Sequence, residues 1–414
     1  MPPVRHIITR TQFHRNRHCE RSAAISLGQG TLQRERARRV APLLAMTNRV
    51  HATRCILSLF IFIVLMATVA CAQAAPPSRQ QVLTSLSDDL IVPRYQEVAR
   101  EMDGLNVALV NLCANPGAET LATARTAWRE ARAPWVRSQA TWFGPVMDRR
   151  SRSLVDWSPV DPERIEATLA KRESVSANDV WEFFGSTQRG LGAIEYVIFG
   201  EDATVLASFG EPGGIRCQYL TALGDVVAEE TAGVLADWTG DGSNGGYAGY
   251  FKGTASISLV EQQAIDEAAR TSVFITRSIA DMKLGKALGS DGGEADPSAI
   301  PGVGGNNAVS DLRNQVLGMQ DVYLGAGTDG ALGISALVRG VSEDADERMR
   351  GHFTATLAAI DGLREPLHTT VVSDPEPARL AHRRMQELQR ALNTEVVSLL
   401  GVTVGFADTD GDGG

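Results

Sequence analysis

The sequence lacks the short motifs by which many enzyme classes are recognised. It contains no Gly-x-Ser-x-Gly nucleophile elbow, no phosphate-binding Walker loop, no Cys-x-x-Cys pair and no His-Glu-x-x-His helix. Histidine is also scarce, because beyond position 75 only His352, His368 and His382 occur, and none are spaced as His-x-x-x-His. A catalytic zinc ion usually has three protein ligands, so these absences weigh against a zinc hydrolase.

The apolar run near the N-terminus is too short to cross a membrane. Ile56–Ala70 covers 15 residues, whereas a spanning helix needs about 20. Two arginines precede the run and small residues follow it, which is the order found in secretory signal peptides. We therefore predict that residues 46–75 are a signal peptide. The basic, aperiodic residues 1–45 are predicted to be a start-site artefact, with translation beginning at Met46.

Two processing routes are open for this leader. Ala72-Gln73-Ala74 fits an A-x-A cleavage site and would leave a soluble protein from Ala75. Val69-Ala70-Cys71 is a weak lipobox and would instead make Cys71 a lipidated first residue, attached to a membrane. Either route predicts a protein of the bacterial cell envelope, in the periplasm or associated with the outer membrane.

Positive charge is scarce once the leader is removed. The whole chain carries a net charge of −9 and residues 1–75 carry +9, which leaves −18 on the body. Nucleic-acid binding requires Lys and Arg against the phosphates, so we expect no nucleic-acid partner. An acidic body is compatible with cations, although a solvated acidic surface explains it equally.

Only two cysteines remain in the body after Cys71, namely Cys113 and Cys217. An even pair in an exported protein predicts a disulfide, because the compartment is oxidising. The loop that it would close has about 100 residues, for which loop-closure entropy predicts a stabilisation of about 4–5 kcal/mol. Two buried free thiols are the alternative.

Helical periodicity dominates the body, and strand patterns are sparse. Apolar residues recur every three or four positions in two long segments: Leu121, Ala124, Trp128, Ala131 and Trp135 in the first, and Ala381, Met385, Leu388, Leu392, Val396 and Leu399 in the second. Pro134 predicts a kink or break near Ala131. Acidic residues and prolines at 374–377 suit a helix start, and Gly401 suits a helix end.

These patterns predict an all-α protein of two packed helical-bundle domains. The N-terminal bundle is expected over residues 76–240 and the C-terminal bundle over 250–414. We place the boundary in the Gly-rich segment Thr239–Gly253, and we expect a second loop at Gly289–Asn307.

One short segment carries more information than the others. Residues 190–200 read Gly-Leu-Gly-Ala-Ile-Glu-Tyr-Val-Ile-Phe-Gly, which resembles the Gly-x-His-x-x-Glu signature of the imelysin-like family. Gly190, Glu195 and Gly200 keep the frame, but Gly192 stands at the histidine position. His and Glu three residues apart share one face of a helix and could hold a metal or share a proton. With glycine at position 192, only the carboxylate of that pair remains.

Three further segments resemble the same family. Residues 127–148 are similar to its Trp-x-x-x-Arg-x-x-Trp helix and Gly-Pro turn, residues 156–161 to its tryptophan-proline segment, and residues 400–412 to its Gly-Phe and Asp-Gly-Asp ending. The resemblance spans essentially the whole body. It implies two helical bundles with the motif near the crevice between them, export, and iron-regulated settings. Some family members are classed as metallopeptidases, a label that rests on the His/Glu pair.

The candidate ligand-binding residues are Glu195, Gly190, Gly192, Arg132 and Trp157. Glu195 could be a metal ligand, a general base or a structural carboxylate. Gly192 is interpreted mainly as a position where a neighbouring element approaches closely. Arg132 lies on or near an apolar stripe, so it either reaches the edge of the helix or pairs with a buried carboxylate, for which Glu195 is one candidate.

The C-terminal residues Asp408–Gly413 match the first half of a calcium loop. The chain stops before the bidentate Glu that an EF-hand requires, which leaves a weak calcium contact or an acidic turn. No cofactor is assigned; iron, zinc or calcium are the metal ions considered.

We predict a ligand-binding or accessory protein in iron or metal acquisition, acting on a small ligand or an envelope protein partner. A metallopeptidase using Glu195 as general base is the first alternative, and the missing histidine counts against an enzyme. A structural or partner-binding envelope module is the second alternative.

Overall fold

The computed structural model describes residues 76–210, 213–240, 245–290, 292–302, 304–327 and 330–403. These residues form helices and connecting segments and contain no strand, which confirms the all-α prediction. The predicted leader and the acidic C-terminal turn lie outside the described residues. The chain from Ala75 onward forms one compact unit.

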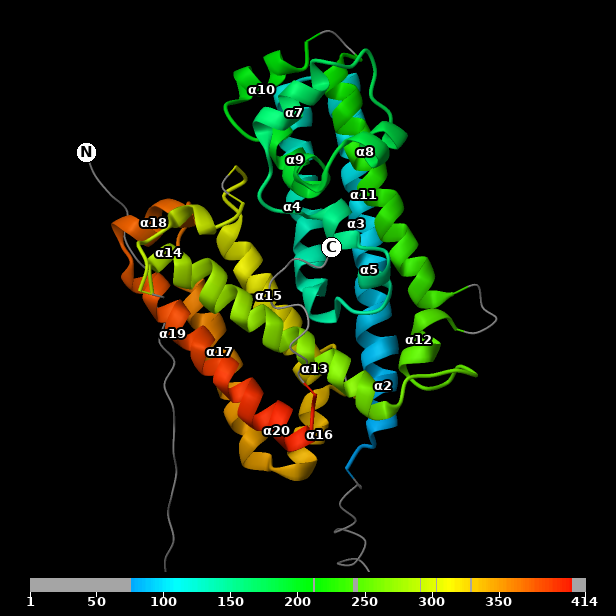
Figure 1. Ribbon diagram of the computed structural model, residues 1–414, viewed down its shortest axis with the longest axis vertical. Helices are drawn as coiled ribbons and strands as arrows, with labels where there is room; N and C mark the ends of the chain where they lie inside the picture. Colours follow the sequence, from blue (N-terminus) through cyan, green and yellow to red (C-terminus); the bar gives the residue numbers. More distant parts are fainter. Residues whose placement is uncertain are drawn as a thin grey trace, which may run out of the picture. The chain divides into compact units, whose positions relative to one another are not determined.

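The first group of helices is built around three long ones, α3 (Val92–Ala114), α4 (Ala118–Arg137) and α11 (Ile215–Thr239). Helix α3 packs against both α4 and α11 (Figure 1). The shorter elements of this group are α2 (Arg79–Ser85), η1 (Leu86–Ile91), η2 (Ser138–Thr141), α5 (Pro145–Asp148), α6 (Ser151–Val155), α7 (Pro162–Leu169), α8 (Ala177–Phe183), η3 (Ser186–Gln188), α9 (Gly190–Ile198), α10 (Asp202–Ser208) and α12 (Gly246–Phe251).

The second group contains the helices drawn from yellow-green to red in Figure 1. Its long members are α13 (Glu261–Arg277), α15 (Ala308–Leu324), α17 (Glu343–Asp361) and α19 (Glu376–Ala391), with α17 packed on both α15 and α19. The remaining elements are η4 (Ser278–Gly285), α14 (Lys286–Leu288), η5 (Pro297–Ala299), α16 (Ile334–Val341), α18 (Leu367–Ser373), η6 (Leu392–Val397) and α20 (Ser398–Leu400). Segments η1, η4 and η6 are π-helical turns that continue longer α-helices.

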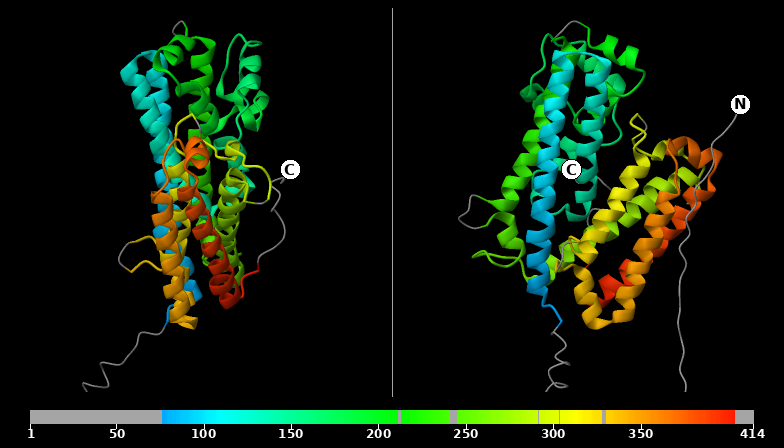
Figure 2. Two further views of the ribbon diagram at one scale, coloured as in Figure 1. Left: turned by 90° about the vertical axis from the view of Figure 1, so that its left-hand side faces the viewer. Right: turned by 180° about the vertical axis from the view of Figure 1, so that it is seen from behind.

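The two groups meet mainly where α15 packs along α4 and η2, as the views of Figures 1 and 2 show. Gly318 of α15 lies so close to the end of α4 that a Cβ there would be 2.1 Å from the carbonyl oxygen of Arg137. The boundary that we placed at Thr239–Gly253 stays a prediction. That segment is not a simple loop, since it contains helix α12.

Local sequence explains where several helices begin and end. Helix α4 continues through Pro134 to Arg137, so the break predicted near Ala131 is absent. A proline only three residues before the end of a helix interrupts little of its hydrogen-bonding ladder. Helix α19 begins at Glu376, directly after Pro375, and Gly401 ends α20 with a left-handed φ of 64°; both agree with the sequence prediction.

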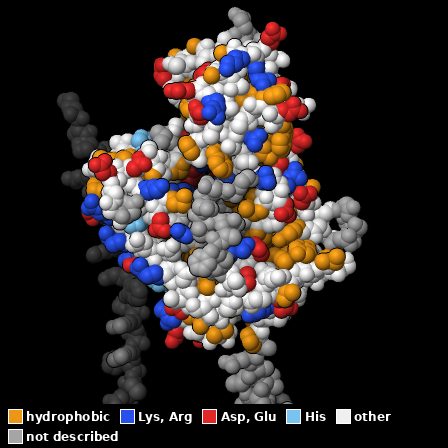
Figure 3. Space-filling view, in the orientation of Figure 1, with side chains coloured by type: hydrophobic (Ala, Val, Ile, Leu, Met, Phe, Trp, Pro, Cys, Tyr) orange, Lys and Arg blue, Asp and Glu red, His pale blue; other side chains and the backbone are white. Residues whose placement is uncertain are grey.

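The core is apolar and the surface is charged with both signs. Trp128, Trp135 and Trp238 are among the largest fully buried side chains, and all three pack against other aromatic rings. Basic and acidic side chains are interspersed over the face drawn in Figure 3, where apolar side chains gather over α12. In the part of the chain that the structure describes, no helix is both long and apolar enough to span a bilayer.

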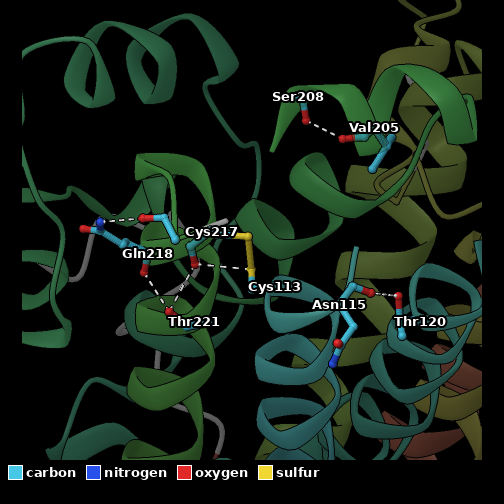
Figure 4. Close-up of a disulfide and its surroundings, with 9 residues drawn as sticks. Cys113, Asn115, Thr120, Val205, Ser208, Cys217, Gln218 and Thr221 are labelled. Atoms are coloured by element: carbon cyan, nitrogen blue, oxygen red, sulfur yellow. Dashed lines mark hydrogen bonds between the residues drawn. A yellow bond between two sulfur atoms is a disulfide. The ribbon is translucent and has the colours of Figure 1, made fainter. Parts of the chain in front are cut away.

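Cys113 and Cys217 form the predicted disulfide, with their Cα atoms 5.4 Å apart. Figure 4 shows that it joins the end of α3 to the beginning of α11. Both cysteines are buried. The cross-link therefore fastens the two helices of the first group that already pack most extensively on one another.

Candidate functional site

Glu195 is the only charged residue of α9, a helix whose other side chains are mostly apolar and buried. Its Oε1 atom accepts a hydrogen bond of 2.6 Å from the backbone N–H of Gly305, which comes from the second group of helices. Its Oε2 atom has no hydrogen bond to any described residue, and the side chain is partly exposed. Burial raises the pKa of Glu195, while the Gly305 N–H and the charge of Arg132 oppose that shift.

Two glycines allow the segment before α15 to approach Glu195 this closely. A Cβ on Gly304 would lie 3.2 Å from Oε1 of Glu195, and a Cβ on Gly305 would lie 2.9 Å from the ring of Trp128. Trp128 is itself held by a 2.8 Å hydrogen bond from its indole N–H to the carbonyl oxygen of Leu191 in α9. The Gly-rich segment predicted only as a loop therefore contributes a hydrogen-bond donor to the site.

Arg132 is buried between two aspartates rather than paired with Glu195. Its Nη1 donates to Asp156 at 2.7 Å, and its Nε donates to Oδ2 of Asp311 at 2.9 Å. Its Nη2 also forms an ion pair of 2.8 Å with Oδ2 of Asp311. Although burial alone would lower the pKa of Arg132, the two carboxylates raise it above its ordinary value. The guanidinium thus stays charged and joins α4, the segment after α6 and α15.

Asp311 also accepts a hydrogen bond of 2.8 Å at its Oδ1 atom from the side-chain amide of Asn307. Next to it lies Lys283, whose Nζ donates to Oε1 of Gln315 at 3.0 Å. Gln315 in turn donates to Gln139 across the contact between the two groups of helices, at 2.6 Å. These side chains form two neighbouring sets of hydrogen-bonded polar groups at the contact of α15 with α4 and η2.

Lys283 lies in the π-helical turn η4, and such turns are frequent at functional sites. Burial lowers its pKa to about 8, opposed mainly by the charge of Asp311. Lys283 and Asp311 also line a cavity of about 10 Å³, which is enough room for one water molecule. We call Arg132, Asp156, Glu195, Lys283 and Asp311 the Arg132 cluster.

Gly192 occupies the position at which the family signature has histidine, and no room for a side chain is left there. A Cβ on Gly192 would lie 2.6 Å from Cγ2 of Val160 and 3.3 Å from the carbonyl oxygen of Trp157. Gly190 begins the same helix with a φ of +79°, and a Cβ there would lie 2.5 Å from the carbonyl oxygen of Val155. Both glycines thus allow the segment from α6 to Val160 to pack directly on α9.

Trp157 contributes to the site through its backbone beside Gly192, and its ring lies 5.2 Å from the guanidinium carbon of Arg152. The structure thus brings Glu195, Arg132, Gly192 and the Trp157 backbone into one region. Sequence reasoning did not select Asp156, Asp311, Lys283 or Gly305. Asp156 could have been found, because it directly precedes Trp157 in a segment that resembles the family.

The described residues contain no group of three or more His, Cys, Asp and Glu side chains arranged to hold a metal ion. Two carboxylates of the Arg132 cluster, Asp156 and Asp311, are already bound to the guanidinium. This leaves the free oxygen of Glu195 as a single oxygen ligand. A metal that arrives with ligands of its own fits this donor set better than a bare ion.

The described residues thus form an all-helical protein with a polar cluster between two groups of helices. The model of the imelysin family, also classed as peptidase M75, matches residues 91–397. The chain therefore belongs to the imelysin family.

Similar proteins come from several bacteria. The chain is 24% identical to iron-regulated protein A of Synechococcus elongatus over 309 residues, which is 73% of this chain and 81% of that protein. It is similar in fold to a crystal structure described as an iron-regulated protein A precursor from Parabacteroides distasonis, with a TM-score of 0.68, 20% identity, and coverage of 79% and 97% of the two chains. An imelysin-like protein from Psychrobacter arcticum gives a TM-score of 0.63 at 14% identity, with the same coverage.

Proposed function

We propose that this protein is exported to the bacterial cell envelope and binds a small metal-containing ligand beside Glu195, as an accessory protein in iron or metal acquisition. The name of one relative, iron-regulated protein A of Synechococcus elongatus, supports the link to iron. The signal-peptide pattern of residues 46–75 supports export. Lipidation at Cys71 would attach the same protein to a membrane.

One observation carries the proposal of a binding site. Glu195 is fixed through Oε1 by a backbone N–H, while Oε2 is left without a partner among the described residues. Next to it, Arg132 is immobilised by two carboxylates, so the charges around Glu195 are preorganised before any ligand arrives. Fixed polar groups of this kind bind a ligand without first losing side-chain freedom.

The geometry gives less support to a metallopeptidase with Glu195 as general base. Such an enzyme needs about three protein ligands for its metal, and the described residues offer no such group. Restoring the histidine of the signature at position 192 would require Val160 to move, because a Cβ there already overlaps its side chain.

Calorimetric titration of the mature chain from Ala75 tests the proposal, with ferric citrate, Fe²⁺, Zn²⁺ and Ca²⁺ as separate probes. We expect ferric citrate to bind and Glu195→Gln to weaken its binding about tenfold or more, as the loss of one charge-assisted contact predicts. Glu182→Gln is the matched control, because Glu182 is exposed on α8. Equal affinities of the wild type and the Glu195 variant would contradict the proposal. Zn²⁺-dependent proteolysis that Glu195→Gln abolishes would instead support the metallopeptidase.

A further inference from the structure

An apolar patch lies on α12 and on the segment that follows it. Ile257 and Val260 are 79% and 65% exposed, which places them among the most exposed large apolar side chains of the described residues. The partly exposed side chains of Tyr247, Tyr250 and Leu259 continue the patch. The rings of the two tyrosines lie 5.4 Å apart, and the backbone N–H of Leu259 donates to the carbonyl oxygen of Tyr250. We call these five residues the α12 patch; apolar side chains are visible over α12 in Figure 3.

Both ends of this segment are fastened to the first described helices of the chain. The side-chain amide of Gln80 in α2 donates to the carbonyl oxygen of Lys252, and Lys252 Nζ forms a 2.7 Å ion pair with Asp88 in η1. At the other end, Arg79 donates to Gln262, two residues after Val260. The α12 patch therefore adjoins the point at which the chain enters α2.

The position of Cys71 in the sequence limits how far a lipid anchor could lie from the patch. Arg79 lies eight positions after Cys71, and an extended chain spans at most about 3.5 Å per position, or about 28 Å in total. A lipid attached at Cys71 would thus hold the α2 end of the protein near the membrane surface. Such an anchor fixes one point and leaves the orientation of the body free.

The composition of the α12 patch suits the interface of a bilayer. Tyrosine is enriched at the level of the lipid headgroups, where its apolar ring and polar hydroxyl are both accommodated. Aliphatic side chains such as Ile257 and Val260 gain free energy when they leave water for the acyl region. Lys252 lies beside the patch in sequence and pairs with Asp88, and the charges acting on Tyr247 are of both signs, from Glu267, Asp148 and Arg270. We therefore expect the contact to depend on apolar burial more than on charge.

We propose that the α12 patch rests on the lipid surface of the cell envelope and orients the protein there. This inference rests on the proposed export, and it names a lipid bilayer as the partner of one face of the molecule. It is separate from ligand binding at Glu195, which lies on α9.

Partitioning of the protein onto lipid vesicles tests this inference without the anchor. The mature chain from Ala75 lacks Cys71 and forms a compact unit. We expect it to bind vesicles of phosphatidylethanolamine and phosphatidylglycerol. The double variant Ile257→Ser with Val260→Ser should bind the same vesicles at least about fivefold more weakly. Val260 precedes α13 as its N-cap residue, where serine is favoured, so this variant should fold.

The matched control carries Val107→Ser and Val372→Ser, since these valines are 64% and 62% exposed on α3 and α18. Its vesicle binding should equal that of the wild type. A second variant, Ile257→Trp, should show fluorescence quenching by lipids with brominated acyl chains, whereas Val107→Trp should not.

Three results would overturn the inference. The wild type would not bind the vesicles, the control variant would lose as much binding as the patch variant, or sedimentation would show a dimer that only the patch variant abolishes. The last result would identify a second copy of the chain as the partner. The mass of the native N-terminus shows separately whether Cys71 is acylated, so failure of the patch and failure of the anchor are distinguishable.

Discussion

Arg132 is the residue on which the polar cluster depends most, because it is buried and holds two carboxylates. Replacing it by methionine removes the charge that both Asp156 and Asp311 contact, and leaves Lys283 as the remaining cation of the cluster. We expect Arg132→Met to lower the free energy of unfolding by about 3–5 kcal/mol, the usual cost of breaking a buried ion pair on one side. Denaturant unfolding followed by circular dichroism measures this change.

Arg313→Met is the matched control for Arg132→Met. Arg313 also pairs with an aspartate, Asp361, but both side chains are about half exposed. Solvent screening makes such pairs worth only about 0–1 kcal/mol. Equal destabilisation by the two substitutions would contradict the role assigned to the buried cluster.

Glu195 makes the stability of the protein depend on pH in a defined direction. Its pKa in the folded protein is raised above the ordinary value of 4.5 because of burial. Protonation therefore favours folding, and this contribution is lost as the pH rises from about 4.5 through the higher pKa of the folded state. We expect Glu195→Gln, which cannot ionise, to remove this part of the pH dependence and to be no less stable than the wild type at pH 7.

Thermal unfolding of the wild type and Glu195→Gln between pH 4 and 8 tests this expectation. The difference in melting temperature should favour the variant at pH 7 and shrink as the pH falls from the raised pKa of the folded state towards 4.5. Glu182→Gln, at an exposed position, should show no such trend. A variant that is less stable at pH 7 would mean that the ionised carboxylate stabilises the fold.

At the scale of elements, the glycine-rich segment before α15 connects the two groups of helices at Glu195. We expect Gly305→Ala to destabilise the protein by about 1–3 kcal/mol, because its Cβ would lie 2.9 Å from the Trp128 ring and displace the segment. It should also weaken ligand binding, since the Gly305 N–H fixes Glu195. Unfolding and titration of the same sample measure both effects.

Gly351→Ala serves as the comparison for Gly305→Ala. Gly351 lies within α17, and a Cβ there would meet nothing within 4 Å. Alanine is favoured over glycine inside a helix by roughly 1 kcal/mol, so this variant should be as stable as the wild type or more stable. If the two substitutions had the same effect, the close packing at Gly305 would not be important.

The disulfide is the second feature that links elements, because it joins α3 to α11. It closes a loop of 104 residues between α3 and α11, and loop-closure entropy predicts a stabilisation of about 4–5 kcal/mol. We expect the double variant Cys113→Ser with Cys217→Ser to lose about that much in denaturant unfolding, while its helical content is retained. A loss below about 1 kcal/mol would show that the disulfide does not restrict the unfolded chain as loop-closure entropy predicts.

At the scale of the whole molecule, periodicity was enough to predict the fold class. The apolar stripe from Leu121 to Trp135 became α4, and the stripe from Ala381 to Leu399 became α19 with its π-helical and α-helical continuations η6 and α20. Of the kink or break predicted near Ala131, the break is absent, because α4 continues through Pro134 to Arg137 and the proline costs the helix only its own backbone donor. Helix α12 was missed because Gly-Gly-Tyr-Ala-Gly-Tyr resembles a loop more than a helix.

The site was only partly predictable, for a physical reason. Glu195 was selected because it keeps its place in a segment that resembles the family signature, and Arg132 because a charge on an apolar stripe is conspicuous in the sequence. Asp311 and Lys283 lie more than 150 residues from Arg132 in the chain and become its neighbours only through packing of α15 and η4. Their own sequence surroundings resemble those of an ordinary amphipathic helix. The role of Gly305 depends on one backbone N–H, which no side-chain pattern reports.

The central claim is that Glu195 forms part of a ligand-binding site, and the metal and ligand content of the native protein tests it most directly. Wild type and Glu195→Gln would be purified from their own cell envelope without chelators or metal-affinity tags, and analysed by elemental and native mass spectrometry. We predict a near-stoichiometric metal or metal complex in the wild type that is lost in Glu195→Gln while the variant stays folded. An identical content in both proteins, or no bound species in the folded wild type, would contradict the claim.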